Sequence, residues 1–141
     1  MDKYDYILID CMPSLGMVTI NALVAADYVL IPVEAAYLPT KGLQQLIKTI
    51  GKVRRRLNPS LEILGILLTK VDRRANFSKD ICDQIREVYG RNIHIFENCI
   101  PMSIRTAEKS AEGRSIYYYD PKGIVAEGYQ SLTKDVLRNE K

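Results

Sequence analysis

Residues 4–16 read YDYILIDCMPSLG, and the expected fold follows from this stretch. Tyr6–Ile9 form a continuous apolar run, which is typical of a strand covered on both faces in a parallel sheet. The run ends on Asp10, and Pro13 and Gly16 then break the pattern. Because ligands of open parallel sheets bind beyond the carboxyl ends of the strands, we expect functional side chains at this strand end.

Strands and helices alternate along the rest of the sequence. Besides 6–9, continuous apolar runs predict strands over 27–33, 61–69 and 93–100. Patterns of helical period predict helices over 14–26, 41–57, 77–89 and 103–111, and a last one starting at 120–121. This order predicts an α/β fold, a mostly parallel sheet with helices on both faces, in a single domain over 1–141.

Several residues are expected to mark helix ends. Ser14 and Asp120 are predicted N-caps, with Pro121 at the first helical position, and Gly90 is a predicted C-cap. In the helix over 77–89, the residues predicted to face inward are those at helical spacing, namely Phe77, Ile81, Ile85 and Val88. Ser103 is a further candidate cap.

Composition excludes several classes of protein. The chain has 141 residues, of which 47% are hydrophobic, enough for one core. No apolar segment approaches the roughly 18 residues of a membrane span, and residues 1–10 do not resemble a secretory signal. Its three cysteines include no C-x-x-C pair, so we expect reduced thiols and a cytoplasmic protein.

Charge is unevenly distributed, although the formal net charge is only +3. No acidic residue lies between Glu34 and Glu62, a window that holds six basic residues: Lys41, Lys48, Lys52, Arg54, Arg55 and Arg56. A local basic face can hold polyanions even on a nearly neutral chain. The cluster Arg54–Arg56 is more simply interpreted as the charged back face of a helix.

Four strand ends carry unusual residues: Asp10, Pro32–Glu34, Thr69–Asp72 and Ile100–Ser103. Asp10 stands where nucleotide hydrolases hold Mg²⁺ beside phosphates, but a strand-end aspartate also caps a following helix, and spacing alone leaves both interpretations open. Residues 69–72, T-K-x-D, are similar to the N-K-x-D loop with which GTPases contact the base. Thr69 in place of asparagine weakens a guanine interpretation, and K-x-D also occurs by chance in turns.

Taken together, the motifs resemble the ParA/Soj family of partitioning ATPases, deviant Walker P-loop proteins and close relatives of MinD. Residues 4–27 resemble the Walker B strand and switch segment, usually D-C-P-P-S-L-G. LEILGILLTKVDRRAN resembles the strand and loop that meet the base, and IPMSIRTAEKSAEGRSI the I-P-R-N-V-R region. VLIPVEAAYLPTKGLQQL and YYYDPKGIVAEGYQSLTKDV resemble the intervening segment and the closing helix.

The resemblance implies roles for eight residues. Asp10 matches the carboxylate that binds Mg²⁺, and Pro13 and Ser14 match the turn that senses the γ-phosphate of ATP. Residues matching those around adenine are Lys70, Asp72 and Pro101. Arg74 and Arg105 match arginines that hold DNA without sequence preference, although ordinary surface charge is the alternative.

The sequence also departs from the family pattern. Met12 replaces the first proline of D-C-P-P, and Met102-Ser103 replace R-N, which removes one positive charge from the loop. No G-K-[ST] motif occurs anywhere in the chain. We therefore expect it to correspond to the C-terminal half of a ParA-type protein, with negligible ATPase activity by itself.

The resemblance implies partners and a location as well. Expected partners are non-specific DNA, a centromere-binding ParB-type protein and a second copy of the chain, joined near Tyr4–Ile9. A cytoplasmic, nucleoid-associated protein is expected, without a membrane role, because the chain ends in polar LTKDVLRNEK where MinD relatives carry an amphipathic helix. A MinD-like membrane ATPase, a non-catalytic regulatory module and a GTPase are the alternatives.

Overall fold

The computed structural model describes residues 3–12, 14–35, 40–104 and 113–139. The chain divides into two compact units, one of Met1–Val29 with Thr40–Glu62 and one of Leu30–Pro39 with Ile63–Lys141. We call them the first and second units and describe each by itself. The sequence-based assignment of a single domain stays a prediction.

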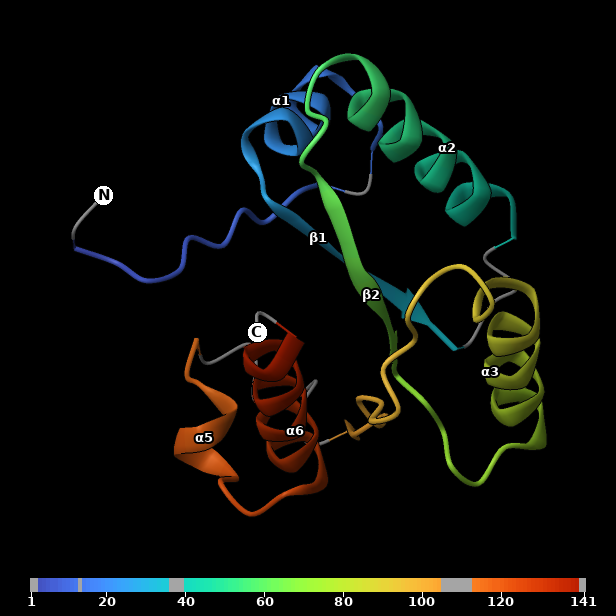
Figure 1. The fold of residues 1–141 in the computed structure, drawn as a ribbon. Coiled ribbons are helices and arrows are strands. Elements are labelled where there is room, and N and C mark those ends of the chain that lie inside the picture. The colour runs from blue at the N-terminus through green and yellow to red at the C-terminus, as the bar shows by residue number, and fades with distance from the viewer. Residues whose placement is uncertain (1–2, 13, 36–39, 105–112, 140–141) are drawn as a thin grey trace. The chain divides into compact units, whose positions relative to one another are not determined.

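The first unit holds two helices that contact each other, α1 (Met17–Ala25) and α2 (Thr40–Arg56) (Figure 1). The loop after α2 closes the end of α1, because the Asn58 side-chain amide donates to the carbonyls of Leu23 (3.1 Å) and Ala26 (2.8 Å). Leu23 lies in the last turn of α1 and Ala26 is its C-cap, where carbonyls have no intrahelical donors. Asn58 therefore acts as a cap supplied from a distant part of the sequence.

The sheet consists of β1 (Tyr28–Glu34) and β2 (Glu62–Thr69). The Glu62 amide donates to the Asp27 carbonyl at one end, and the Ala35 amide donates to the Thr69 carbonyl at the other. Residue numbers on the two strands rise together from one bond to the next, so the strands are parallel. This confirms the parallel α/β sheet expected from the sequence.

The chain around residues 93–101 runs beside β2 without forming a full strand. Parallel bridges join Ile66 to Ile95 and Val71 to Pro101. Between them the Phe96 amide donates to the Ile66 carbonyl and the Ile100 amide donates to the Leu68 carbonyl. The chain therefore advances four residues, from 96 to 100, while β2 advances only two, from 66 to 68. This bulge interrupts the strand predicted over 93–100 and leaves only isolated bridges.

Gly65 is required by this close pairing. A Cβ atom at this position would lie 2.8 Å from Cε2 of Phe96 and 2.9 Å from the carbonyl oxygen of His94. Real Cβ atoms do not approach other atoms so closely, so only glycine lets the 94–96 segment lie against the backbone of β2.

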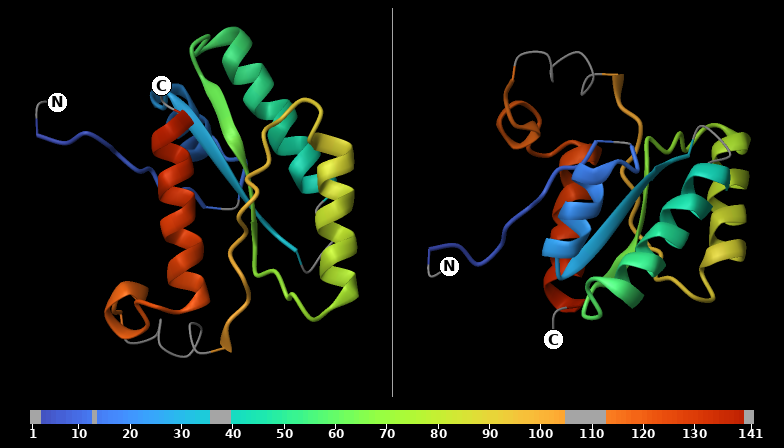
Figure 2. Two further views of the ribbon diagram at one scale, coloured as in Figure 1. Left: turned by 60° about the horizontal axis from the view of Figure 1, so that its bottom comes forward. Right: turned by 90° about the horizontal axis from the view of Figure 1, so that it is seen from above.

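Helices cover both faces of β2 within the second unit. Figures 1 and 2 show α3 (Asn76–Tyr89) and α6 (Ile124–Asn139) on opposite sides of this strand. A core cluster joins Leu67, Phe96, Ile100 and Val125, and Leu132 and Val136 of α6 pack against it. On α3, the buried apolar side chains are Ile81, Cys82 and Ile85. None of the helices in the described ranges has the length and apolar character needed to cross a bilayer.

Three sequence-based expectations about the N-terminal stretch and α3 are wrong. Tyr6–Ile9 form no strand, and Leu8 is 94% exposed, because neither strand of the sheet offers its backbone to this run. Phe77 and Val88 are exposed rather than inward-facing, since a 14-residue helix on this sheet buries a narrower stripe than the pattern suggested. Gly90 is the C-cap of α3, as predicted.

Two predicted helix caps are also wrong. Gly16 rather than Ser14 is the N-cap of α1, and the Ser14 carbonyl instead accepts from the Thr19 hydroxyl at 2.5 Å. Asp120 is the C-cap of the short helix α5 (Ile116–Tyr119), and its carbonyl accepts from the Gly123 amide in a turn that delays α6 until Ile124. The helix predicted over 103–111 lies almost wholly outside the described residues.

Candidate functional site

The candidate site of the second unit is built around Lys70, directly after β2. Lys70 has φ 51°, the left-handed conformation, and it is the one non-glycine residue with positive φ in the part of the chain that the structure describes. Such a conformation costs a bulky residue on the order of 1–2 kcal/mol, so the neighbours must enforce it. Both do: the Thr69 carbonyl accepts from Ala35 (3.0 Å), and the Val71 amide donates to Ile100 (3.1 Å).

The Lys70 side chain is oriented by an ion pair across the two strand ends. Its Nζ contacts Oε1 of Glu34, the last residue of β1. Both side chains are more than half exposed, at 62% and 54%, so the pair contributes at most about 1 kcal/mol to stability. Its effect is therefore on geometry, because it draws the lysine stem along the carboxyl edge of the sheet.

Asp72 begins the loop that leads to α3, and its side chain stabilises the turn that follows it. Its Oδ1 accepts from the Arg74 amide at 2.9 Å. The Asp72 amide donates to the Ser78 hydroxyl (3.1 Å), which in turn donates to the Ala35 carbonyl (3.3 Å). Ser78 is buried, so this relay ties the loop after β2, the start of α3 and the end of β1 together.

Pro101 is joined to the same loop by the backbone. The Val71 amide donates to Ile100, and the Met102 amide donates back to Val71 at 3.0 Å. Pro101 itself is buried between these two bonds. The structure thus brings Lys70, Asp72 and Pro101 to one edge, as expected for the carboxyl ends of neighbouring parallel strands.

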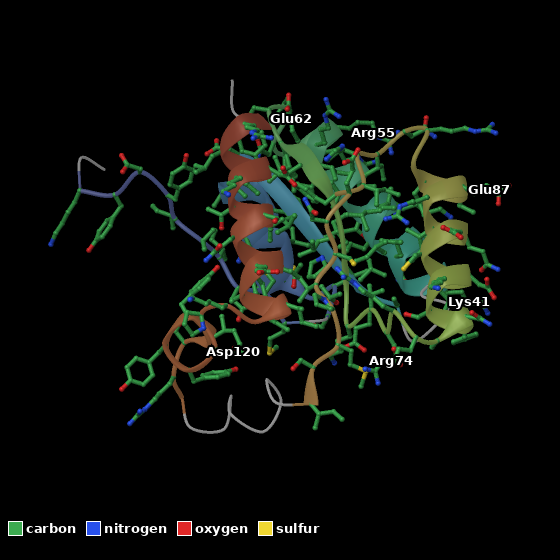
Figure 3. All side chains as sticks on the ribbon, turned by 90° about the horizontal axis from the view of Figure 1, so that it is seen from below. Lys41, Arg55, Glu62, Arg74, Glu87 and Asp120 are labelled. Carbon is green, nitrogen blue, oxygen red and sulfur yellow. The ribbon has the colours of Figure 1, made fainter. Side chains whose placement is uncertain are left out.

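Of the two predicted DNA-binding arginines, Arg74 lies in the same loop. Its side chain is exposed and is labelled in Figure 3 at the segment between β2 and α3. Arg105 lies outside the described residues. The arginine therefore has the accessibility that a phosphate contact needs, while its amide holds the Asp72 carboxylate in place.

The other predicted site residues belong to the first unit. Asp10 is exposed and lies in an irregular segment rather than at the end of a strand. The Ser14 amide donates to the Met12 carbonyl at 2.7 Å, and the Ser14 carbonyl accepts from the Thr19 hydroxyl of α1. Pro13 lies outside the described residues. Within the described ranges, no three His, Cys, Asp or Glu side chains gather to form a metal site.

Two residues of the site had no assigned role from the sequence. Glu34 was noticeable as an acid at a strand end, but the motif gave no sign that it pairs with Lys70. Ser78 resembled an ordinary residue in the first turn of a helix, and only the fold reveals that its hydroxyl links three segments.

Sequence comparison places these features in a family. A family model described as an AAA domain matches residues 1–63. The sporulation initiation inhibitor protein Soj of Bacillus subtilis is 41% identical over 137 residues, 97% of this chain and 53% of the relative. The chromosome partitioning protein ParA of Myxococcus xanthus is 41% identical over 138 residues, 98% of this chain and 48% of the relative. The chain belongs to the ParA/Soj family.

The chain spans about half the length of the curated relatives that it matches. A solved structure is also similar, that of cobyrinic acid a,c-diamide synthase from Mycobacterium smegmatis with a bound ATP analogue and magnesium. It superimposes with a TM-score of 0.73 at 30% identity, over 94% of this chain and 47% of that one. The chain therefore combines the sequence of a ParA/Soj protein with a fold that is shared by a protein with a bound ATP analogue.

Proposed function

We propose that this ParA/Soj chain provides part of an ATP-dependent partitioning ATPase. The observation that carries the proposal is the pre-formed edge at the end of β2, where Lys70 is held in the left-handed conformation beside Asp72 and Pro101. The similar structure with a bound ATP analogue and magnesium supports a nucleotide as the ligand of this fold.

In this proposal, the three residues of the edge contact adenine. The aliphatic stem of Lys70, fixed by its backbone and by Glu34, packs on the plane of the base. Asp72 accepts from the amino group at the base edge through Oδ2, since Oδ1 already accepts from Arg74. Pro101 is buried next to this loop and is proposed to line the apolar floor of the contact. A set that combines exposed Lys70, half-buried Asp72 and buried Pro101 fits a flat heterocycle better than a charged ligand.

Asp10 is the proposed Mg²⁺ ligand, and Pro13 with Ser14 the proposed γ-phosphate-sensing turn. A single exposed carboxylate suits Mg²⁺, which is commonly held by one or two carboxylates together with substrate phosphates. When bound, the ion neutralises phosphate charge. The Ser14 side chain is exposed, so its hydroxyl is available to donate to a phosphate oxygen, whereas its amide already donates to Met12.

The proposed partners are non-specific DNA, held by Arg74 and Arg105, a ParB-type protein and a second copy of the chain. Self-association is proposed near Tyr4–Ile9, where an extended apolar run is exposed. Such runs add readily to the edges of other sheets. A cytoplasmic, nucleoid-associated location follows from this set of partners.

A non-catalytic regulatory module is the second candidate function. The 141 residues contain no G-K-[ST], the motif whose amides and lysine cradle phosphates in P-loop proteins. A chain that binds the base without that cradle would act by occupying or modulating a ParA or ParB partner.

Competition with a fluorescent ADP derivative in the presence of Mg²⁺ tests the nucleotide proposal. Weak, saturable binding by the 141-residue chain is expected, and Lys70→Ala with Asp72→Ala should abolish it. Lys79→Ala with Asp80→Ala is the matched control, since it removes the same two charges from exposed positions in the first turns of α3. Equal binding by the site variant and the control would refute the proposed edge.

A further inference from the structure

The basic row of α2 is a surface that the proposed site does not use. We define it as four exposed residues, Lys41, Lys48, Lys52 and Arg55. At about 100° per residue they fall within a sector of roughly 60° on one side of the helix. Lys41 and Arg55, labelled in Figure 3, mark its two ends. The row therefore runs nearly parallel to the helix axis for about 21 Å.

Helix stability does not explain this arrangement. Lys48 and Lys52 are like charges four residues apart, and Lys52 and Arg55 are three apart, spacings at which like charges repel each other. Lys41 lies in the first turn, where the helix dipole disfavours a cation and where no acid is present. Among the described residues, no ion pair neutralises any of the four. A row of this kind is expected to have an anionic partner.

The flanks of the row indicate which polyanion fits. Gln44 and Gln45 lie beside it, and α2 contains no aromatic residue on which the bases of a single strand could stack. Its apolar residues Leu43, Ile50 and Val53 are buried, and Leu46 and Ile47 are half-buried. At about 100° per residue all five fall on the side of the helix opposite the row, so the row has no apolar residue beside it to enter a bilayer. What remains is a straight series of cations with hydrogen-bonding neighbours, suited to a regular phosphate backbone.

We propose that the basic row of α2 is a second DNA-binding surface, which holds the phosphate backbone of a duplex over about six base pairs. The inference rests on the DNA part of the proposed function and adds to it residues other than Arg74 and Arg105. Three lysines and one arginine supply point charges without base-edge contacts, so binding is independent of sequence. Arg55 keeps its terminal Nη groups for this contact, since only its Nε donates to the helix, at Gly51 (3.2 Å).

The test is the salt dependence of binding to a random-sequence duplex, measured by fluorescence anisotropy. Each phosphate contact contributes about 0.9 to the slope of log affinity against log salt. Lys48→Gln with Lys52→Gln should lower the slope by about 1.8 and weaken binding at moderate salt by about tenfold. Lysine and glutamine have similar helix propensities, so the fold should be retained, and circular dichroism checks this.

Two further variants separate the possible outcomes. Lys122→Gln with Lys134→Gln removes the same charge from exposed positions of the second unit and should leave the slope unchanged. If the Lys48→Gln with Lys52→Gln variant had the same slope as the wild type, the proposal that the basic row binds DNA would be refuted. If Arg74→Gln with Arg105→Gln alone reduced the slope, DNA binding would survive and only the α2 surface would be refuted. Equal binding of the wild type to duplex DNA and to anionic vesicles would also contradict a DNA surface.

Discussion

At the scale of the residue, Lys70 combines an unfavourable backbone conformation with the proposed contact to the base. The residue is fixed because both flanking peptide groups are bonded to neighbouring segments, at Ala35 and Ile100. Unfavourable conformations persist where the surrounding structure over-determines them, and they concentrate at binding sites. The positive φ of Lys70 also predicts how substitutions at this position change the free energy of unfolding.

Replacing Lys70 by glycine and by alanine measures the cost of its positive φ. Lys70→Gly should exceed Lys70→Ala in free energy of unfolding by about 1 kcal/mol, because glycine adopts positive φ without steric cost. Both variants lose the Glu34 ion pair equally, so their difference isolates the backbone term. Urea denaturation followed by circular dichroism gives both values. An alanine variant as stable as the glycine variant would show that φ is relaxed in solution.

Cys82 offers a second measurement at this scale. Burial on α3 raises the pKa of its thiol, Cys99 and Asp83 raise it further, and Arg86 opposes them. Only the thiolate is nucleophilic, so iodoacetamide at pH 8 should modify Cys82 about tenfold or more slowly than exposed Cys11. Mass spectrometry of quenched samples measures both rates.

The raised pKa also has a consequence for stability. In the unfolded chain the Cys82 thiol ionises from about pH 8.5 upward, whereas in the folded protein it stays protonated to higher pH. The unfolded state therefore binds fewer protons in this window, and the free energy of unfolding should fall as pH rises through it. Cys82→Ser should flatten that dependence, and an unchanged pH profile would contradict the assignment.

At this scale, the placement of three predicted residues follows from the sequence, while their binding role stays a prediction. We expected the strand ends that carry Lys70, Asp72 and Pro101 to lie together, because the carboxyl ends of parallel strands share an edge. In the described structure, backbone hydrogen bonds from Val71 to Ile100 and from Met102 to Val71 join these segments. The left-handed backbone of Lys70 was not expected, because it depends on bonds to segments that lie 30 or more residues away. Long-range pairing of this kind leaves no local signature.

At the scale of the element, the two phenylalanines of the chain have opposite environments. Phe96, beside β2, is 1% exposed in the core cluster, whereas Phe77 on α3 is 59% exposed. Phe96→Ala should cost about 3–5 kcal/mol of unfolding free energy, through lost burial and the cavity that it leaves. Phe77→Ala should change it by no more than about 0.5 kcal/mol.

Urea midpoints measure both effects. Because a loss of 3–5 kcal/mol can exceed the reserve of a small protein, Phe96→Leu serves as a milder variant that should remain folded with a lowered midpoint. Equal midpoints for the two alanine variants would show that the segment around residues 93–101 does not pack on β2 as described.

Elements with a strong internal pattern were predicted well. The bounds of α2, β2 and α3 differ from expectation by a residue or so, because helical periodicity and continuous apolar runs report directly on burial. The run Tyr6–Ile9 has the sequence of a buried strand but is exposed, since a strand also needs a neighbour that the pattern does not encode. The start of α6 was misplaced because Asp120 closes α5 instead.

At the scale of the whole molecule, the chain shares its fold with a protein that binds an ATP analogue, but its 141 residues contain no G-K-[ST] motif. Phosphoryl transfer depends mainly on positioning and on neutralising charge. We therefore expect the 141-residue chain to release no phosphate from ATP and Mg²⁺ above a buffer control in a sensitive colorimetric or radiolabel assay. Robust Mg²⁺-dependent turnover, lost in Asp10→Asn, would contradict this expectation.

The central claim is that the edge around Lys70 and Asp72 binds adenine, and chemical-shift mapping tests it most directly. Titrating the ¹⁵N-labelled chain with ADP and Mg²⁺ should shift the amides of residues 70–74 and of Met102, with smaller shifts around Glu34. GDP should produce weaker shifts at the same positions. Shifts confined to other segments, or none at saturating ADP, would contradict the account.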